Sequence, residues 1–321
     1  MKFISVIQSN ELSIIEGDIP TISDEEVLVE VKAIGVNRAD ILQRYGKYPA
    51  PKGESDILGL EMSGIVSKVG RNVQQWHLGD AVFGLVPGGA YAQYTKLLSS
   101  HLFSLPQGFT FEQGASLAEV FLTAYQSLCS IANAKTEDKV LIHAGASGVG
   151  TAAIQLAKAM GCEVTVTVSN KYKEGACIEL GADNVINYKS TDFVEWTKEH
   201  MPRGFDVIID VVAGDYVKKN INVCALDGRI VILSMLGGRY AEQLDVAKLL
   251  QKRISLFAST LRNRSNDYKT KLINDFQNEF SFSNGQLQPV IDAILSWQDV
   301  NEAHQILMDN RNVGKVVMTI D

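Results

Sequence analysis

The stretch 139–151 constrains the fold most, because a short apolar run leads there into a glycine-rich turn and then a helical pattern. Its first five residues are of strand type, and the turn carries Gly145, Gly148 and Gly150. The helical pattern runs on to Gly161, where a glycine cap is expected to end the helix. In this order of elements, N–H groups at the helix start bind the pyrophosphate of a dinucleotide. We therefore predict a dinucleotide site at this turn.

Strand and helix patterns alternate from this turn to about residue 260. Alternation of this kind indicates an α/β domain in which a doubly wound, Rossmann-type parallel sheet is covered by helices on both faces. The predicted strands are 139–143, 163–168, 184–187, 205–211, 229–234 and 254–260, and the predicted helices are 148–160, 172–180, 192–200 and 215–225.

The segment before this block has a different character, with short apolar strands separated by many glycines and prolines. Residues 25–34 alternate strictly between apolar and polar, as a half-buried strand does. This texture is typical of a barrel-like β domain. Two helical patterns and a terminal strand, 315–320, follow residue 262; the strand lies outside the alternation, so we expect it to pair with the first domain. The predicted domains are 1–120 with 262–321, and 121–261.

Composition excludes several classes of protein. The chain has 321 residues, a formal net charge of −7 and 46% hydrophobic residues, which argues against nucleic acid or an anionic membrane as the main partner. No apolar run reaches the roughly 18 residues that a membrane span needs. The four cysteines are far apart in the sequence and form no Cys-x-x-Cys motif, so neither a cysteine zinc site nor a disulfide framework is expected. We expect a cytoplasmic protein.

The segment after the second predicted strand bears on which dinucleotide is bound. Enzymes that use NAD carry an acid there to accept a hydrogen bond from the ribose 2′-hydroxyl. Here Ser169, Lys171 and Lys173 precede the first acid, Glu174. A hydroxyl and two ammonium groups suit a 2′-phosphate, although a solvated basic turn is the alternative. The sequence therefore favours NADPH. Ser147 replaces the middle glycine of the pyrophosphate motif, and its hydroxyl can still donate to a phosphate oxygen.

Several short motifs resemble one superfamily along the whole chain. The chain resembles the medium-chain dehydrogenases/reductases, and within them the zinc-independent, zeta-crystallin-like quinone oxidoreductases of the tumour-suppressor-inducible branch. The motifs that carry the resemblance are 35–40 (GVNRAD), 57–64 (ILGLEMSG), 79–80 (GD), 122–126 (LTAYQ), 144–150 (AGASGVG), 187–188 (NY) and 312–315 (NVGK).

The resemblance implies a GroES-like barrel catalytic domain that contains both chain ends, with the nucleotide domain inserted and a cleft for nicotinamide and substrate. Zinc-dependent relatives carry Gly-His-Glu where this chain has 59–61 (GLE), and a cysteine ligand where it has Asn37. Neither Leu60 nor Asn37 is a suitable zinc ligand. The resemblance therefore implies hydride transfer without a metal site.

The same resemblance supplies candidate residues. Tyr48 is expected to act as phenolic donor or substrate clamp, with Asn37 and Asp40 positioning ring and water, while a purely structural turn at a helix start is the alternative. The expected cofactor contacts are Thr123 near the nicotinamide, Met235 near its ribose, and Asn312 closing the cleft. Further contacts are expected at the pyrophosphate (Ala146, Ser147, Gly148, Val149) and around the 2′-phosphate (Ser169, Lys173, Tyr188).

Three functions are open at this level. The first is an NADPH-dependent reductase of a small quinone or enone, the second an enoyl-thioester reductase, and the third a non-catalytic NADPH-binding protein with a structural or regulatory role. A homodimer is expected from the resemblance, with strand 254–260 as its contact, because that strand would otherwise be an unpaired sheet edge.

Overall fold

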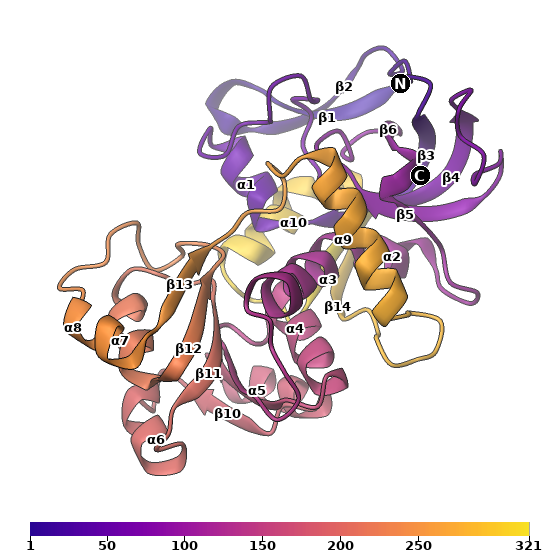
Figure 1. Ribbon diagram of the computed structural model, residues 1–321. Coiled ribbons are helices and arrows are strands. Elements are labelled where there is room, and N and C mark those ends of the chain that lie inside the picture. Colours follow the sequence, from indigo (N-terminus) through magenta and orange to yellow (C-terminus); the bar gives the residue numbers. More distant parts are fainter. Residues whose placement is uncertain (321) are drawn as a thin grey trace. The chain divides into compact units, whose positions relative to one another are not determined.

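The computed structural model describes residues 1–320, and in it the chain divides into two compact units (Figure 1). The first unit comprises Met1–Val120 together with the chain from Arg262 onward, and the second comprises Phe121–Leu261. The first is built on an antiparallel-rich sheet and the second on a parallel sheet with helices. The predicted fold class, a Rossmann-type domain with a β-rich GroES-like domain, is confirmed.

The first unit is organised on a seven-stranded sheet in the order β14-β15-β3-β4-β5-β7, with β6 paired to β3. Strand β3 is the longest and pairs with β4, β6 and β15. Its valines 27, 29 and 31 are buried while Glu30 and Lys32 are partly exposed, but Leu28 and residues 33–36 are buried as well, so the predicted strict alternation holds only over residues 29–32. The elements are β1 (Lys2–Val6), η1 (Gln8–Asn10), β2 (Leu12–Glu16), β3 (Glu26–Val36), α1 (Arg38–Arg44), β4 (Glu61–Val69), β5 (Ala81–Leu85), β6 (Tyr94–Leu98), η2 (Ser99–His101), β7 (Leu102–Ser104), α2 (Phe111–Gly114) and α3 (Ala118–Tyr125), which runs on into the second unit.

The end of the chain returns to this sheet. Strand β15 (Lys315–Thr319) lies antiparallel to β3, with Val316 opposite Val36, so the predicted return of the terminal strand is confirmed. It is preceded by α9 (Asn266–Glu279), β14 (Ile291–Ser296), η4 (Trp297–Asp299) and α10 (Val300–Met308). Strand β14 was not predicted. It is an edge strand that pairs only with β15 among the described residues, and none of its residues is fully buried.

The second unit has six parallel strands in the order β10-β9-β8-β11-β12-β13. The order reverses at β8, and ligands of such sheets bind at the carboxyl end of the strands where it reverses. Helices lie on both faces, with α4 and α5 on one side and α6 and α7 on the other (Figure 1). The elements are η3 (Gln126–Ile131), β8 (Lys139–Ile142), α4 (Gly148–Ala159), β9 (Glu163–Val168), α5 (Lys171–Glu179), β10 (Asn184–Asn187), α6 (Phe193–His200), β11 (Phe205–Asp210), α7 (Asp215–Val223), β12 (Cys224–Ile232), α8 (Val246–Lys252) and β13 (Ser255–Ala258). Helix α8 was not predicted.

The glycine turn between β8 and α4 has the shape that its sequence predicts. A Cβ on Gly145 would lie 2.6 Å from the Val166 side chain, and one on Gly150 would lie 2.4 Å from the carbonyl oxygen of Ala144. Neither position can therefore hold a larger residue without moving the backbone or β9. Gly161 follows α4 with a φ of +79°, which confirms the predicted glycine stop.

Within residues 1–320 no helix combines the length and apolar character required to cross a membrane.

Candidate functional site

The junction between β3 and α1 holds two of the predicted site residues. Asn37 occupies the N-cap position of α1, and its backbone N–H donates to the Asp40 carboxylate at 2.8 Å. The same carboxylate accepts from the backbone N–H of Gly59 at 3.2 Å and from the Tyr91 hydroxyl at 3.2 Å. Asp40 is completely buried, and its hydrogen bonds join the segments that carry Asn37, Gly59 and Tyr91. The structural alternative, a helix start, thus accounts for the contacts of Asp40.

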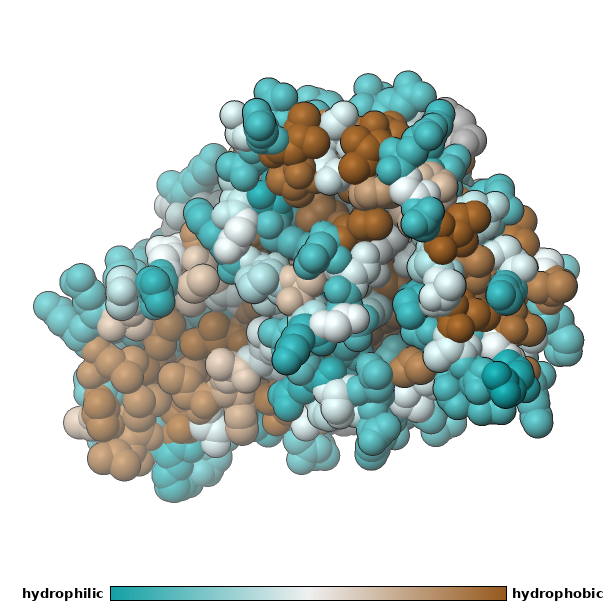
Figure 2. Space-filling model, turned by 90° about the horizontal axis from the view of Figure 1, so that it is seen from above, coloured by the Kyte–Doolittle hydropathy of each residue, from teal (hydrophilic) through white to brown (hydrophobic). Residues whose placement is uncertain are grey.

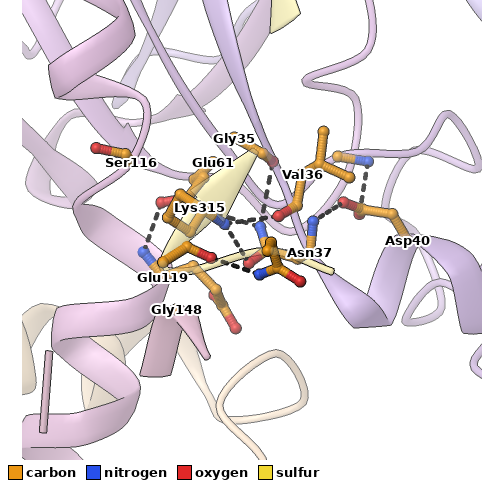
Figure 3. A network of polar contacts seen from close by, with 12 residues as sticks. Gly35, Val36, Asn37, Asp40, Glu61, Ser116, Glu119, Gly148 and Lys315 are labelled. Carbon is orange, nitrogen blue, oxygen red and sulfur yellow. Dashed lines mark hydrogen bonds and ion pairs between the residues drawn. The ribbon is translucent and has the colours of Figure 1, made fainter. Parts of the chain in front are cut away.

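The side chain of Asn37 is also fully engaged. Its amide nitrogen donates to Glu61 Oε1 at 3.0 Å and to the Gly35 carbonyl at 3.2 Å, and its amide oxygen accepts from Lys315 Nζ at 2.7 Å (Figure 3). Gly35 has no room for a side chain, since a Cβ would lie 2.6 Å from the Glu61 carboxylate. Asn37 is therefore part of a packed polar network.

Lys315 is the cation of this network. Its ammonium lies 2.6 Å from Glu61 Oε1 and 2.7 Å from the Val36 carbonyl oxygen. The side chain of Lys315 is only 4% exposed and that of Glu61 is 0% exposed. The other Glu61 oxygen accepts from the backbone N–H of Glu119 at 3.0 Å. Such close contacts offset the large cost of taking both charges out of water.

The third acidic or basic group in the network is Glu119, at the start of α3. Desolvation and the negative charge of Glu61 together raise the pKa of the Glu119 carboxyl to about 7, and the charge of Lys315 opposes the shift. The carboxyl can therefore hold a proton near neutral pH. Sequence reasoning missed Glu61, Glu119 and Lys315 as site residues. The motifs 57–64 and 312–315 marked two of them, but only the pairing of β15 with β3 brings them together.

The residues at the positions of the zinc ligands do not fit a zinc ion. Leu60 has no donor atom and is 2% exposed. Asn37 is an amide whose oxygen already accepts from Lys315, and the ammonium would repel a second cation at this place. The chemistry of this donor set thus does not support metal binding.

Tyr48 lies in the irregular loop after α1, directly before Pro49, and is half-buried. Its ring packs against the guanidinium of Arg262, with 5.5 Å between the guanidinium carbon and the ring centroid. Burial raises the pKa of the Tyr48 phenol, Glu119 raises it further, and Arg262 lowers it. The phenol therefore stays protonated at neutral pH and can donate a hydrogen bond.

The predicted pyrophosphate residues form the turn at the carboxyl end of β8. Ala146 is buried, and Ser147, Gly148 and Val149 are partly exposed. Ser147 is the N-cap of α4, and its hydroxyl oxygen accepts from the Gly150 N–H at 3.1 Å. The hydroxyl proton is left for a further acceptor.

The residues predicted to surround a 2′-phosphate follow two neighbouring strands. Ser169 comes directly after β9 and Tyr188 directly after β10, and the Tyr188 N–H donates to the Val168 carbonyl at 3.0 Å. These two residues therefore lie at the same edge of the sheet. Lys173 is in the first turn of α5, with its backbone N–H bonded to the Asn170 side chain at 2.9 Å, and is 8% exposed.

The three remaining predicted contacts lie in different places. Thr123 is on α3, and its buried hydroxyl oxygen has no hydrogen-bond partner among residues 1–320. Met235 follows β12 and is 57% exposed. Asn312 precedes β15, and its amide donates to the Gly314 carbonyl at 2.7 Å. Of these three residues, Thr123 is the one whose side chain has a hydrogen-bonding group without a partner in this part of the chain.

Comparison with known proteins agrees with this architecture. A family model described as alcohol dehydrogenase GroES-like domain matches residues 23–107, and one described as zinc-binding dehydrogenase matches residues 148–278. The human quinone oxidoreductase is 27% identical over 305 residues, covering 94% of this chain and 91% of that protein. The zebrafish (Danio rerio) synaptic vesicle membrane protein VAT-1 homolog is 28% identical, covering 94% of this chain and 66% of its own length.

Solved structures agree as well. Escherichia coli quinone oxidoreductase complexed with NADPH has a TM-score of 0.85 and 28% identity, covering 99% of this chain and 98% of that one. The CurK enoyl reductase has a TM-score of 0.88 and 26% identity, covering 100% and 99%. Together with the fold and site, these matches define a two-unit reductase. The chain belongs to the medium-chain dehydrogenase/reductase superfamily, and quinone oxidoreductases and enoyl reductases are among the proteins to which it is similar.

The buried ion pair gives a first prediction. Lys315→Met leaves the Glu61 carboxylate buried without its cation, so we expect the free energy of unfolding to fall by about 3–5 kcal/mol. Urea denaturation measures the loss. The matched control is Lys271→Met, whose ion pair with Asp275 is on the exposed face of α9 and whose loss should cost at most about 1 kcal/mol. Equal effects of the two substitutions would contradict a special role for Lys315.

Asp40 gives a prediction about pH. Burial raises the pKa of the Asp40 carboxyl to about 6, against hydrogen bonds and the Lys315 charge, which lower it. In the unfolded chain the pKa of an aspartate is about 4, so the folded protein binds the Asp40 proton more tightly than the unfolded chain does. The protonated carboxyl therefore contributes to the free energy of unfolding, fully below pH ~4, and this contribution is lost as the pH rises through ~6. Relative to Asp40→Asn, which cannot ionise, the wild type should lose about 2–3 kcal/mol between pH 4 and 7. Urea unfolding of both proteins across this range measures it; a constant difference would refute the assignment.

Proposed function

We propose that this protein is an NADPH-dependent reductase that transfers hydride to a quinone or enone without a metal. The observation that carries the proposal is the Asn37–Glu61–Lys315 network, in which a buried amide and ammonium replace a metal-binding donor set. The similarity to the human and Escherichia coli quinone oxidoreductases supports it. In this proposal the first compact unit is the catalytic domain and the second is the dinucleotide-binding domain.

The second unit has the features that a dinucleotide requires. Gly145 and Gly150 keep the turn tight, and Ser147 to Val149 present the start of α4 to a pyrophosphate. The unpartnered hydroxyl of Thr123 is suited to hydrogen-bond the carboxamide of a nicotinamide. When bound, NADPH supplies the hydride.

Ser169, Lys173 and Tyr188 are the groups that we propose around the 2′-phosphate. The hydroxyl of Ser169 and the ring of Tyr188 are at one sheet edge, next to the first turn of α5. The positive end of this helix and the Lys173 ammonium both favour an anion. Asn170, the cap of this helix, adds no carboxylate that would repel a phosphate.

Tyr48 is the proposed catalytic group. A quinone or enone that accepts hydride at carbon develops negative charge on its oxygen, and a hydrogen-bond donor at that oxygen lowers the barrier. The protonated, half-buried phenol of Tyr48 is suited to this task. Asn37 and Asp40 fix the junction between β3 and α1, and α1 leads into the loop that carries Tyr48.

A second candidate function is reduction of an enoyl thioester. The likeness to the CurK enoyl reductase favours it. The highly reducing polyketide synthase of Didymella fabae is 29% identical over 303 residues, a match that covers only 16% of that protein. The hydride step is the same for both functions. They differ in the acceptor, so a substrate panel separates them.

The cofactor proposal predicts a preference that can be measured. With a small ortho- or para-quinone, kcat/KM should be higher with NADPH than with NADH. Lys173→Ala should raise the KM for NADPH about tenfold or more and leave that for NADH nearly unchanged, because one charge-assisted bond to a phosphate is lost. The control is Lys171→Ala, which removes a neighbouring exposed lysine of the same turn and should have a smaller effect.

The opposite outcomes are informative. Equal changes in KM for both cofactors after Lys173→Ala would refute the 2′-phosphate site. Turnover of a crotonyl thioester that exceeds turnover of every quinone and simple enone would favour the second candidate function. Cofactor binding without any hydride transfer would sink both enzymatic functions and leave a structural or regulatory role.

We further propose that the protein is a homodimer in which a second copy pairs along β13. This strand is at the edge of the parallel sheet and is exposed along its whole length, with Leu256 41% and Phe257 37% exposed. Val246 and Leu250 of the preceding helix α8 are 56% and 74% exposed. Figure 2 shows an apolar area on the side where Figure 1 places α8 and β13. A second copy would cover this surface and complete the edge.

The dimer proposal predicts the mass in solution. Light scattering should give twice the mass of one chain for the wild type and one chain for Leu256→Asp, because a buried charge on the edge strand opposes pairing. Ile178→Asp is the control, since Ile178 is an exposed apolar residue on α5, and it should leave the mass unchanged. A monomeric wild type would contradict the proposal.

The proposal includes a cytoplasmic location. All four cysteines, at 129, 162, 177 and 224, are free thiols, as expected in a reducing compartment.

A further inference from the structure

Arg262 is an unusual buried cation in the turn between β13 and α9. It is 4% exposed, and its Nε donates to the Pro87 carbonyl at 2.8 Å. Its other two nitrogens, Nη1 and Nη2, are buried and have no hydrogen-bond acceptor within residues 1–320. No carboxylate of this part of the chain forms an ion pair with it. Groups buried in this way are costly and call for a physical explanation.

The aromatic ring of Tyr48 is the partner that the guanidinium does have. The distance of 5.5 Å from the guanidinium carbon to the ring centroid is within the range of a cation–π contact. A desolvated contact of this kind is stronger than an exposed one, because the ring then replaces water as the group that compensates the charge. The contact therefore holds the Tyr48 ring as well as the arginine.

The surroundings fix both side chains. Tyr48 precedes Pro49, which restricts its backbone to extended conformations. On the other side, Gly88 packs so closely that a Cβ there would lie 2.5 Å from the Ser55 carbonyl oxygen and 3.3 Å from Arg262 Nη2. The guanidinium plane is thus held by the Pro87 carbonyl and its neighbouring turn, and the ring rests on it.

We propose that Arg262 is a positioning residue of the reductase: its guanidinium holds the Tyr48 ring and makes the Tyr48 hydroxyl a stronger hydrogen-bond donor to the acceptor oxygen. The inference rests on the proposed function, in which Tyr48 is the donor. It assigns a role in the reaction to the segment that leads from the second unit back into the first. A lysine could not replace it fully, because an ammonium lacks the planar face that stacks on a ring.

The charged groups around this pair agree with the assignment. Burial lowers the pKa of the Arg262 guanidinium, while Asp40, Tyr48, Glu119 and Glu54 raise it, so the cation is retained. For the Tyr48 phenol, burial and Glu119 raise the pKa and Arg262 lowers it. Lys269, on α9, is a further cation of this region. Arg262 is therefore the group that opposes the effects of burial and of Glu119 on the phenol.

The experiment compares wild type with Arg262→Met, which removes the charge, and Arg262→Lys, which keeps the charge and loses the planar face. The matched control is Arg264→Met, because Arg264 is an exposed arginine of the same turn with its own ring contact, 4.7 Å from the Tyr268 centroid. Proteins labelled with ¹³Cζ-tyrosine are titrated by NMR, with Tyr48→Phe to assign the Tyr48 signal. Near-ultraviolet circular dichroism checks that each variant is folded.

We expect the Tyr48 pKa to rise by about one unit in Arg262→Met and by less in Arg262→Lys, and to stay at its wild-type value in Arg264→Met. With NADPH and a quinone, kcat should fall about tenfold in Arg262→Met with little change in the KM for NADPH. In a Tyr48→Phe background the Arg262→Met substitution should have no further effect on kcat.

Two results would overturn the inference. The first is a folded Arg262→Met protein, or a folded Arg262→Lys protein if the former does not fold, with an unchanged Tyr48 titration and an unchanged kcat. The second is a tenfold loss of kcat that persists in the Tyr48→Phe background. The titration needs no turnover. A wild type without reductase activity would therefore refute the proposed function, while the titration would still test the effect of Arg262 on Tyr48.

Discussion

The Lys315 ammonium is held by the Val36 carbonyl at the end of β3, the Asn37 amide at the start of α1, and the Glu61 carboxylate at the start of β4. One buried charge thus fixes where three segments of the first unit meet. The network extends through Glu61 to the backbone of Glu119. Asp40, three residues after Asn37, fixes the other side of the junction through Gly59 and Tyr91. Helix α1 begins at this junction and leads into the loop with Tyr48.

In the function that we propose, this arrangement takes the place of a zinc site. A metal would supply positive charge at one point, and here a lysine supplies it at the same junction but directs it to neighbouring protein groups. The donor that we propose for the acceptor oxygen is instead a phenol beside a second buried cation, Arg262. In this proposal two buried cations have separate roles. Lys315 maintains the structure, and Arg262 adjusts the Tyr48 phenol.

Much of the fold could be predicted from the sequence, for identifiable reasons. The parallel sheet was accessible because strong apolar runs alternate with helical patterns, and the glycine turn because Gly145 and Gly150 have no room for a side chain. Strand β14 and helix α8 were missed because both are poorly buried, which leaves little periodicity in their sequences. Lys315, Glu61 and Arg262 could not be recognised from patterns along the chain. Their roles come from contacts between residues that are far apart in the chain, such as Lys315 with Glu61, and Arg262 with Pro87, which are 175 positions apart.

The place of β15 in the chain has a consequence for synthesis on the ribosome. The second unit is continuous, so its sheet can be completed as soon as β13 has emerged. The first unit cannot be completed at that stage, because β15, which pairs with β3, is translated almost 300 residues after it. Until then the end of β3, residues 33–36, lacks its partner on one side, and Glu61 has no counter-charge. The nascent chain therefore carries a folded second unit and an incomplete first unit. Before β15 has been synthesised, the incomplete first unit is exposed to aggregation and to chaperone binding.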